Sequence, residues 1–311
     1  NSTMKTILAL ALIASIAGPA LAATWTASSS FTASAAMGVA AFDEDRVIVA
    51  GGNNGVGPVV WKSSDGGKTF ATKPHDSALM FMAAAADTGD KLTGNVAGFM
   101  GSQFSNNTGE AFFKALLGSG GPCQSVEAVH GTKGQVMLTG QTIFWNGVGI
   151  SSDGGAHFTT HEIWTNNSPF GARYGAAPSP KVMYATGGSW PSNNAENALP
   201  EEFHAVSARF GMHPRTGELR MGAGKTNYTQ YTGAIAKSED GGKTWTTQFK
   251  VQGVNEYYFN GIDCYDETHC VAVAEADSGT GAGSRIFQTT NGKDWKQVVF
   301  TAGAAHSPMG G

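Results

Sequence analysis

Charged residues are scarce in this sequence. Lys, Arg, Asp and Glu make up 14% of the 311 residues, and the formal net charge is −4, whereas an average globular protein has about 25% charged residues. Proteins that bind nucleic acid carry basic runs or patches that neutralise phosphates, and this chain has no basic run. The composition therefore argues against a nucleic-acid partner. No heptad pattern or basic amphipathic segment indicates a coiled coil or a membrane-surface helix.

Long hydrophobic runs are equally rare. The apolar run at residues 7–16 is too short for a transmembrane helix, which needs about 20 apolar residues. A Gly-Pro pair ends this run, and Ala20-Leu21-Ala22 then provides a small-x-small cleavage site. We predict a signal peptide at residues 1–22, a single domain at residues 23–311, no membrane span, and a secreted or endomembrane-lumenal location.

Only three cysteines are present. Cys264 and Cys270 flank a polar turn between two strand-like runs, so they can face each other across a hairpin and form a disulfide. Two buried thiols, or a metal pair assisted by His269, are the alternatives. Cys123 is then left over, as a free buried thiol or as an intermolecular partner.

Motifs for metal binding and catalysis are also missing. The eight histidines show no metal-ligand spacing, and the chain has no His-Glu-x-x-His motif, nucleophile elbow or phosphate-binding glycine loop. Glycoside hydrolysis requires two facing carboxylates, but Glu201 and Glu202 are adjacent and cannot both point at one bond. We expect no metal and no cofactor, and the balance is toward a protein that is not an enzyme.

What the sequence does contain is a repeated turn with the pattern Ser-x-Asp-Gly-Gly-x-x-aromatic. Full copies start at Ser63, Ser151 and Ser238, and weaker copies start at Ser105 and Thr289, which gives spacings of 42, 46, 87 and 51 residues. The Asp side chain can accept backbone N–H groups of its own turn, and the glycines supply positive φ. A period of about 40–50 residues with short strands between turns is typical of a propeller with one four-stranded blade per repeat.

These residues resemble the Asp-box, or BNR, repeat of the sialidases, the sortilin-type receptors, some glycoside hydrolases and the photosystem II stability and assembly factor-like propellers. The resemblance covers nearly all of residues 23–311 and implies an all-β propeller. It implies a structural role for the third residue of each turn: Asp65, Asn107, Asp153, Asp240 and Asn291. The form of the turn is closest in style to the photosystem-assembly-like propellers, which implies a non-catalytic scaffold that binds another polypeptide.

We expect six recognisable blades. Because 87 is about twice the other spacings, we predict a worn turn at residues 192–196 and assign separate blades to the regions before and after it. The second of these blades would have strands at residues 204–212 and 218–222. The competing interpretation makes residues 187–232 one long insertion within a five-bladed ring.

The sequence near the two ends of the chain is relevant to how the ring of blades closes. Residues 23–26 resemble residues 243–246, which directly follow a full turn. Propellers remove their exposed edge by pairing an N-terminal strand with C-terminal strands. This likeness predicts a seven-bladed ring and a natural chain that continues beyond residue 311, and the alternative is a six-bladed ring with a short tail.

Binding residues are expected on the face opposite the repeated turns. Aromatic rings beside Asn or Arg suit a sugar or a peptide, because flat rings stack and polar groups fix the orientation. The candidates are Trp145, Trp164, Arg173, Trp190, Tyr228 and Tyr231. The alternative for each ring is packing between adjacent blades.

Three triplets, at Asn106, Asn166 and Asn227, are candidate glycosylation sites. Glycans at the second and third would shift a partner toward the rim or sides of the molecule. Assembly with other chains is therefore a further expectation.

We predict a secreted, non-catalytic scaffold that engages a protein or glycan partner. The alternative is a glycan-active hydrolase of the sialidase-like superfamily, a resemblance that implies three converging arginines and a Tyr nucleophile with an acidic partner. The early Phe/Tyr-Arg-Ile-Pro motif of sialidases is missing, and residues 284–287 are only a poor echo of it.

Overall fold

The computed structural model describes residues 36–53, 57–76, 78, 80–99, 101–117, 125–141, 146–165, 168–189, 191, 230–276 and 279–303. These residues form 21 strands, and no helix occurs among them. In this part of the chain nothing helical is therefore long and apolar enough to cross a membrane. The predicted all-β class is confirmed.

The strands form five antiparallel sheets, each built from four strands that follow one another in the chain. The first sheet contains β1 (Ala36–Ala41), β2 (Val47–Asn53), β3 (Gly57–Ser63) and β4 (Ala71–Thr72). The second contains β5 (Met80–Ala86), β6 (Gly94–Phe99), β7 (Gly101–Ser105) and β8 (Phe113–Lys114). The third contains β10 (Ser125–Ala128), β11 (Val136–Gln141), β12 (Asn146–Ser151) and β13 (His157–Glu162), and the short β9 (Leu116–Leu117) joins β13 in parallel.

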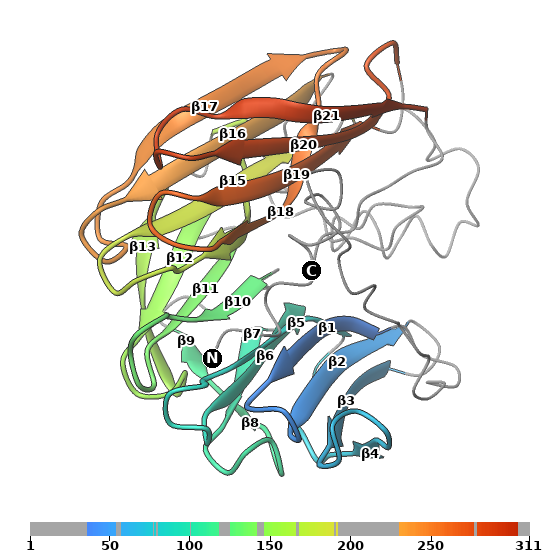
Figure 1. The fold of residues 1–311 in the computed structure, drawn as a ribbon, viewed down its shortest axis with the longest axis vertical. Coiled ribbons are helices and arrows are strands. Elements are labelled where there is room, and N and C mark those ends of the chain that lie inside the picture. Colours follow the sequence, from blue (N-terminus) through green and yellow to red (C-terminus); the bar gives the residue numbers. More distant parts are fainter. Residues whose placement is uncertain are drawn as a thin grey trace, which may run out of the picture.

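The fourth sheet contains β14 (Ala172–Ala176), β15 (Met183–Ser189), β16 (Tyr231–Ser238) and β17 (Thr246–Gly253). The fifth contains β18 (Tyr258–Cys264), β19 (Cys270–Ala276), β20 (Gly283–Thr289) and β21 (Lys296–Ala302). Figure 1 shows the five sheets following one another around an arc, with the first and fifth sheets at its two ends. This arrangement is that of propeller blades.

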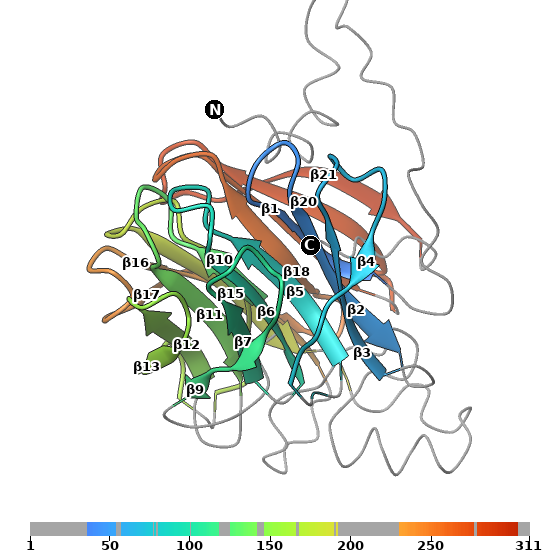
Figure 2. The ribbon, with the colours of Figure 1, turned by 90° about the horizontal axis from the view of Figure 1, so that it is seen from below.

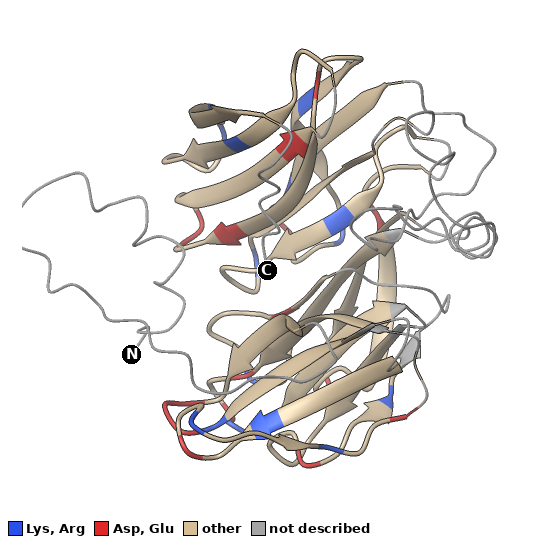
Figure 3. Cartoon of the chain, turned by 90° about the vertical axis from the view of Figure 1, so that its right-hand side faces the viewer, with Lys and Arg blue, Asp and Glu red and all other residues tan. Residues whose placement is uncertain are grey.

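Apolar clusters join each sheet to the next. Phe42, Ile48 and Phe81 belong to the cluster between the first and second sheets, and further clusters join the second to the third, the third to the fourth, and the fourth to the fifth. Figure 2 views the sheets from the side, with tight turns gathered along its upper edge. In Figure 3 most of the strand ribbon carries no charged residue, so the sheets can pack face to face.

The division of the chain into two blades on either side of residue 192 is wrong. β15 pairs directly with β16, in a ladder that runs from Met183 opposite Ser238 to Ser189 opposite Thr232. Residues 190–229 therefore form an insertion inside one blade, as in the competing interpretation. Removing these 40 residues from the spacing of 87 leaves 47, which lies within the other spacings of 42 to 51, so the apparent double period is a coincidence of length.

Several expectations lie outside the described residues. They are the worn turn at 192–196, the strands at 204–212 and 218–222, the likeness at 23–26, and the chain beyond residue 303. A ring of six or seven blades stays a prediction.

The repeated turns share one hydrogen-bond pattern. In the first turn, Gly67 N donates to Ser63 Oγ at 2.8 Å and Thr69 N donates to Asp65 Oδ1 at 2.9 Å. The turns at Ser151 and Ser238 repeat these bonds. Each of the three full turns has both glycines at positive φ, for example 72° at Gly66. A side chain at such a position would be strained, which explains the glycine pair.

The weaker turns keep the pattern with other residues. Asn107 Oδ1 accepts from Glu110 N and Ala111 N, and Thr108 takes the place of the first glycine at a φ of 61°. In the last turn, Asn291 Oδ1 accepts from Lys293 N and Asp294 N. In these two turns the amide oxygen of an asparagine, which carries no negative charge, therefore replaces the carboxylate as the acceptor.

The carboxylates of the full turns make the free energy of unfolding depend on pH. Donation from the Thr69 hydroxyl and then from the Thr69 N–H lowers the pKa of Asp65 to about 2. At Asp153, burial raises the pKa, but hydrogen bonds from His157 and Ser151 outweigh it and lower the pKa to about 2. An unfolded Asp titrates near pH 4. The stabilisation is therefore complete above about pH 4 and is lost as the pH falls toward about 2.

We expect the thermal midpoint to fall steeply between pH 4 and pH 2, measured by circular dichroism in buffers of constant ionic strength. In the variant Asp153→Asn, which copies Asn107, the midpoint at neutral pH is lower but its fall in acid is shallower. An unchanged acid slope in this variant would contradict a contribution from Asp153.

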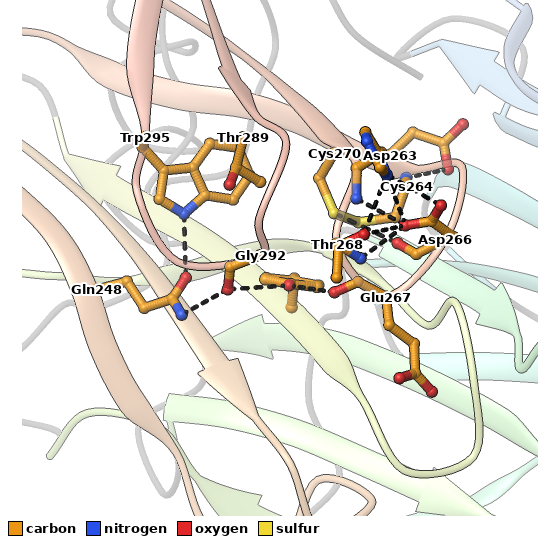
Figure 4. Close-up of a disulfide and its surroundings, with 12 residues drawn as sticks. Gln248, Asp263, Cys264, Asp266, Glu267, Thr268, Cys270, Thr289, Gly292 and Trp295 are labelled. Carbon is orange, nitrogen blue, oxygen red and sulfur yellow. Dashed lines mark hydrogen bonds and ion pairs between the residues drawn. A yellow bond between two sulfur atoms is a disulfide. The ribbon is translucent and has the colours of Figure 1, made fainter.

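The fourth and fifth sheets are joined on the side of these turns by a hydrogen-bonded row. Trp295 Nε1 donates to Gln248 Oε1 at 3.0 Å, and Gln248 Nε2 donates to Gly292 O at 2.9 Å (Figure 4). The Tyr184 hydroxyl donates to Glu267 O at 2.7 Å and lies 3.2 Å from Gly292 O. Burial raises the pKa of Tyr184, so its hydroxyl stays a donor.

The predicted disulfide lies beside this row. Cys264 and Cys270 are bonded to each other and are directly opposite in the β18–β19 ladder, with Cα atoms 4.0 Å apart (Figure 4). The bond closes the turn that contains Glu267. It therefore fixes the carbonyl that accepts from the fourth sheet.

Candidate functional site

Two of the predicted binding residues, Arg173 and Tyr231, lie in one buried cluster between the fourth and fifth sheets. Arg173 is on β14, and its guanidinium carbon is 5.0 Å from the centre of the Tyr258 ring on β18. The rings of Tyr231 and Tyr258 are stacked, with centroids 6.3 Å apart. Arg173 is 3% exposed and Tyr231 is fully buried.

Glu275, near the end of β19, holds this cluster together. Its Oε1 accepts from the Tyr258 hydroxyl and from Asn260 Nδ2, each at 2.5 Å. Arg173 Nη2 in turn donates to Asn260 Oδ1 at 3.2 Å. A cation, an acid and an amide are therefore connected through hydrogen bonds in a site from which water is largely excluded, which strengthens each bond.

The cluster lies on the side opposite the repeated turns. Each repeated turn follows the end of a third strand, such as β16, whereas Tyr231 is the first residue of that strand. Arg173 and Tyr258 are likewise at the beginnings of first strands. This is the face on which binding was expected.

Trp164 lies elsewhere, in a groove between the third and fourth sheets. The groove has a volume of about 510 Å³ and is lined by the connection after β13 and by the outer strand β17. Trp164 is 8% exposed, its Nε1 donates to Thr247 Oγ1 at 3.0 Å, and its ring is 6.1 Å from that of Phe170. Most of the indole therefore packs between blades, as in the alternative interpretation of these rings.

The groove also has polar walls. Thr165, Thr247 and Lys250 are exposed along it, beside the half-buried Phe170. Buried Asn146 fixes the connection, because its side chain donates to Phe170 O at 2.8 Å and accepts from Ala172 N at 2.8 Å. A half-buried aromatic ring beside hydroxyl groups and an ammonium group can bind a sugar or an acidic side chain.

Arg285, in the segment that weakly echoes a sialidase motif, has a structural environment. Its guanidinium carbon lies 4.5 Å from the Tyr257 ring centre and 4.6 Å from that of Phe300, and it donates to Gly281 O at 2.6 Å. Burial lowers the pKa of Arg285 and raises the pKa of Tyr257 to about 12. The arginine therefore stabilises one end of the fifth sheet by packing between two rings and bonding to a backbone carbonyl.

Of the remaining predicted binding and glycosylation residues, the structure describes one and leaves five undescribed. Asn106 is exposed in its turn, whereas Trp145, Trp190, Tyr228, Asn166 and Asn227 lie outside the described residues. Among the described residues, no group of three or more His, Cys, Asp or Glu side chains is placed to hold a metal ion.

The sequence analysis missed Glu275, Asn260 and Lys250. The first two interrupt runs of apolar and small residues in strands whose neighbouring residues there are buried. A charged residue in such a run requires a buried partner, and that signal could have identified the cluster. Lys250 has no comparable signal, because an exposed lysine on an outer strand is ordinary.

No family model matches the sequence, and no curated protein matches it. Among solved structures, a GH74 enzyme from Niastella koreensis is 16% identical with a TM-score of 0.53, over 84% of this chain and 38% of its own. An ancestral GH74 enzyme is 13% identical with a TM-score of 0.51, over 85% of this chain and 32% of its own. YCF48 from Cyanidioschyzon merolae is 12% identical over 88% of each chain, with a TM-score of 0.40.

The chain is a β-propeller. At these identities the GH74 likenesses support the propeller fold alone, since one fold hosts many activities. The propeller spans less than two fifths of the length of the Niastella koreensis enzyme that it resembles.

Proposed function

We propose that this protein is a secreted, non-catalytic propeller of the Asp-box type that binds a protein or glycan partner. The observation that carries the proposal is the groove beside Trp164, in which the half-buried Phe170 ring lies with the exposed Lys250 and Thr247. The ladder between β16 and β17 holds Thr247 and Lys250, and Asn146 bonds to the carbonyl of Phe170, which lowers the ordering cost of binding. The shared hydrogen-bond pattern of the five turns supports the Asp-box assignment.

The Arg173 cluster supports a scaffold. Its acid accepts two hydrogen bonds from the same sheet, and its cation lies over a ring and donates to an amide. These interactions join two blades. The disulfide between Cys264 and Cys270 supports an oxidising compartment and thus secretion.

A glycan-active hydrolase is the second candidate, and one observation favours it. The Tyr258 hydroxyl donates to Glu275 at 2.5 Å, and Arg173 lies over the same ring, so a tyrosine, an acid and an arginine meet at one place. Turnover of a sialoside or another glycoside that is abolished by Tyr258→Phe would favour the enzyme over the scaffold.

The binding proposal is tested with a glycan array and a peptide library, followed by titration of each hit. We expect Lys250→Glu to weaken binding at least about tenfold, equivalent to about 1.4 kcal/mol, because it reverses the charge at the groove. The matched control is Lys243→Glu, another exposed lysine, which lies in a repeated turn on the opposite face. Equal affinities of both variants for every hit would reject the groove as the binding site.

A further inference from the structure

The fourth sheet has a long outer strand, β17, whose residues line the groove beside Trp164. β17 pairs with β16 on one side and with no described strand on the other. It has eight residues, whereas the outer strands of the first and second sheets, β4 and β8, have two residues each. An edge strand presents a row of N–H and C=O groups that can pair with another segment. β17 therefore offers a much longer pairing edge than these two strands.

In the second and third sheets, the connection from the preceding sheet pairs with the outer edge. His75 forms a parallel bridge with Phe112, and Phe112 N donates to Pro74 O at 2.9 Å. In the same way Leu116–Leu117, which form β9, pair in parallel with His157–Phe158 of β13. Both connections add a short extended segment to the outside of the next sheet. The outer edges of this propeller therefore accept strand addition within the chain itself.

The connection that leads to the fourth sheet behaves differently. Ile163 N and Trp164 N both donate to Asn146 O in the third sheet, at 3.0 Å and 3.3 Å. The described residues of this connection form no backbone hydrogen bond with β17, and the Trp164 indole reaches only the hydroxyl of Thr247. The groove of about 510 Å³ lies between the connection and β17, so it gives access to the outer strand.

The edge of β17 is regular from Phe249 to Gln252. Phe249 lies opposite Ile235 and Gln252 lies opposite Thr232, after a bulge at Gln248. Four residues of a strand span about 13 Å. In an antiparallel ladder, alternate residues direct their N–H and C=O groups to the same neighbour. Two of these four residues therefore present both groups to the outer side.

The side chains along this edge favour an acidic ligand. Phe249 and Val251 pack into the apolar cluster with the fifth sheet, so Lys250, between them, points to the opposite face, where it lines the groove. Lys250 is exposed and forms no ion pair with any described residue. No Asp or Glu lines the groove. An acidic side chain on an added strand would meet an ammonium group with no competing carboxylate.

We propose that β17 binds an extended acidic segment of a partner protein by strand addition, with the segment paired along residues 249–252 and an Asp or Glu beside Lys250. This inference rests on the proposed function of the groove and selects a polypeptide over a glycan as the partner. Main-chain pairing supplies the affinity, and the charge of Lys250 supplies the preference for an acidic segment. A glycan has no row of alternating N–H and C=O groups, so it cannot form this ladder.

The probe is a random library of peptides of about 12 residues, displayed on phage and selected on the wild-type protein. The tightest peptide that loses affinity for Lys250→Glu but not for Lys243→Glu is then N-methylated at one residue at a time, and each affinity is measured by calorimetry. N-methylation removes one backbone donor and leaves the side chain unchanged. We expect a loss of at least about tenfold at alternate residues and a much smaller loss at the residues between them. Circular dichroism establishes that both protein variants are folded.

Two measurements on the same complex examine the protein side. Hydrogen exchange followed by NMR should slow at two alternate amides among residues 249–252 when the peptide binds. A charge-reversed peptide, in which lysine replaces the acidic residue, should recover most of the affinity that is lost in Lys250→Glu, because opposite charges again face each other across the strands.

Several results would overturn strand addition. Equal losses along the whole N-methylated series, unchanged exchange on β17, or hits confined to glycans would overturn it and leave the proposed binding function in place. The absence of any peptide or glycan that is sensitive to Lys250→Glu would reject both. A dimer that forms in proportion to concentration and is lost in Lys250→Glu would assign this edge to a second copy of the chain.

Discussion

Tyr184→Ala should lower the free energy of unfolding by about 3–5 kcal/mol, the range for truncation of a buried aromatic residue. Tyr184 is fully buried, packs edge-on against Trp295, and donates to the carbonyl of Glu267 in the next blade. Truncation removes this packing and leaves the carbonyls of Glu267 and Gly292 with one donor fewer. Urea unfolding followed by far-ultraviolet circular dichroism measures the change.

Tyr184→Phe is the matched control, because it keeps the ring and removes only the hydroxyl. We expect it to cost about 1 kcal/mol, the net contribution of an intramolecular hydrogen bond. Similar losses in both variants would mean that the hydroxyl, and not the packing, joins the two blades. A small loss in both would show that the junction is held mainly by the apolar cluster around Phe259.

Glu275→Ala is the second change with a large expected effect. It leaves the buried Tyr258 hydroxyl and Asn260 amide without their acceptor. Each unsatisfied buried donor costs about 1–3 kcal/mol, so the expected loss is about 2–6 kcal/mol. The same unfolding experiment measures it.

Glu275→Gln separates hydrogen bonding from charge. The glutamine oxygen can accept both hydrogen bonds, so a loss much smaller than that of Glu275→Ala would show that the acceptor matters most. If the two variants are equally unstable, the negative charge opposite Arg173 is the stabilising feature. Wild-type stability of Glu275→Ala would contradict any structural role for the cluster.

The fold was predictable because its signal is local. A turn such as Ser63 to Phe70 is closed by its own side chains and glycines, so its sequence is recognisable without knowledge of the rest of the chain. The disulfide between Cys264 and Cys270 was predictable for the same reason. The insertion between β15 and β16 was not, because the pairing of Ser189 with Thr232 joins residues that no short-range pattern connects.

The candidate site was predicted less well for a related reason. Arg173 and Tyr231 were expected on a common face, but Glu275 connects them only through the packing of two blades. Trp164 was expected to be exposed, whereas its indole is buried by β17 and bonded to Thr247, 83 residues later in the chain. A sequence gives the kind of side chain, but its exposure depends on which strand packs over it.

The pairing of Ser189 with Thr232 also offers a way to build on this propeller. The chain leaves the fourth sheet and returns to it at neighbouring positions, so whatever is placed between them needs only two ends that lie close together. The entropy of closing a loop grows slowly with its length, and domains tolerate insertion where both ends are fixed at one point of a stable frame. A folded guest protein with adjacent termini could therefore replace residues 190–229 and leave the ladder between β15 and β16 intact.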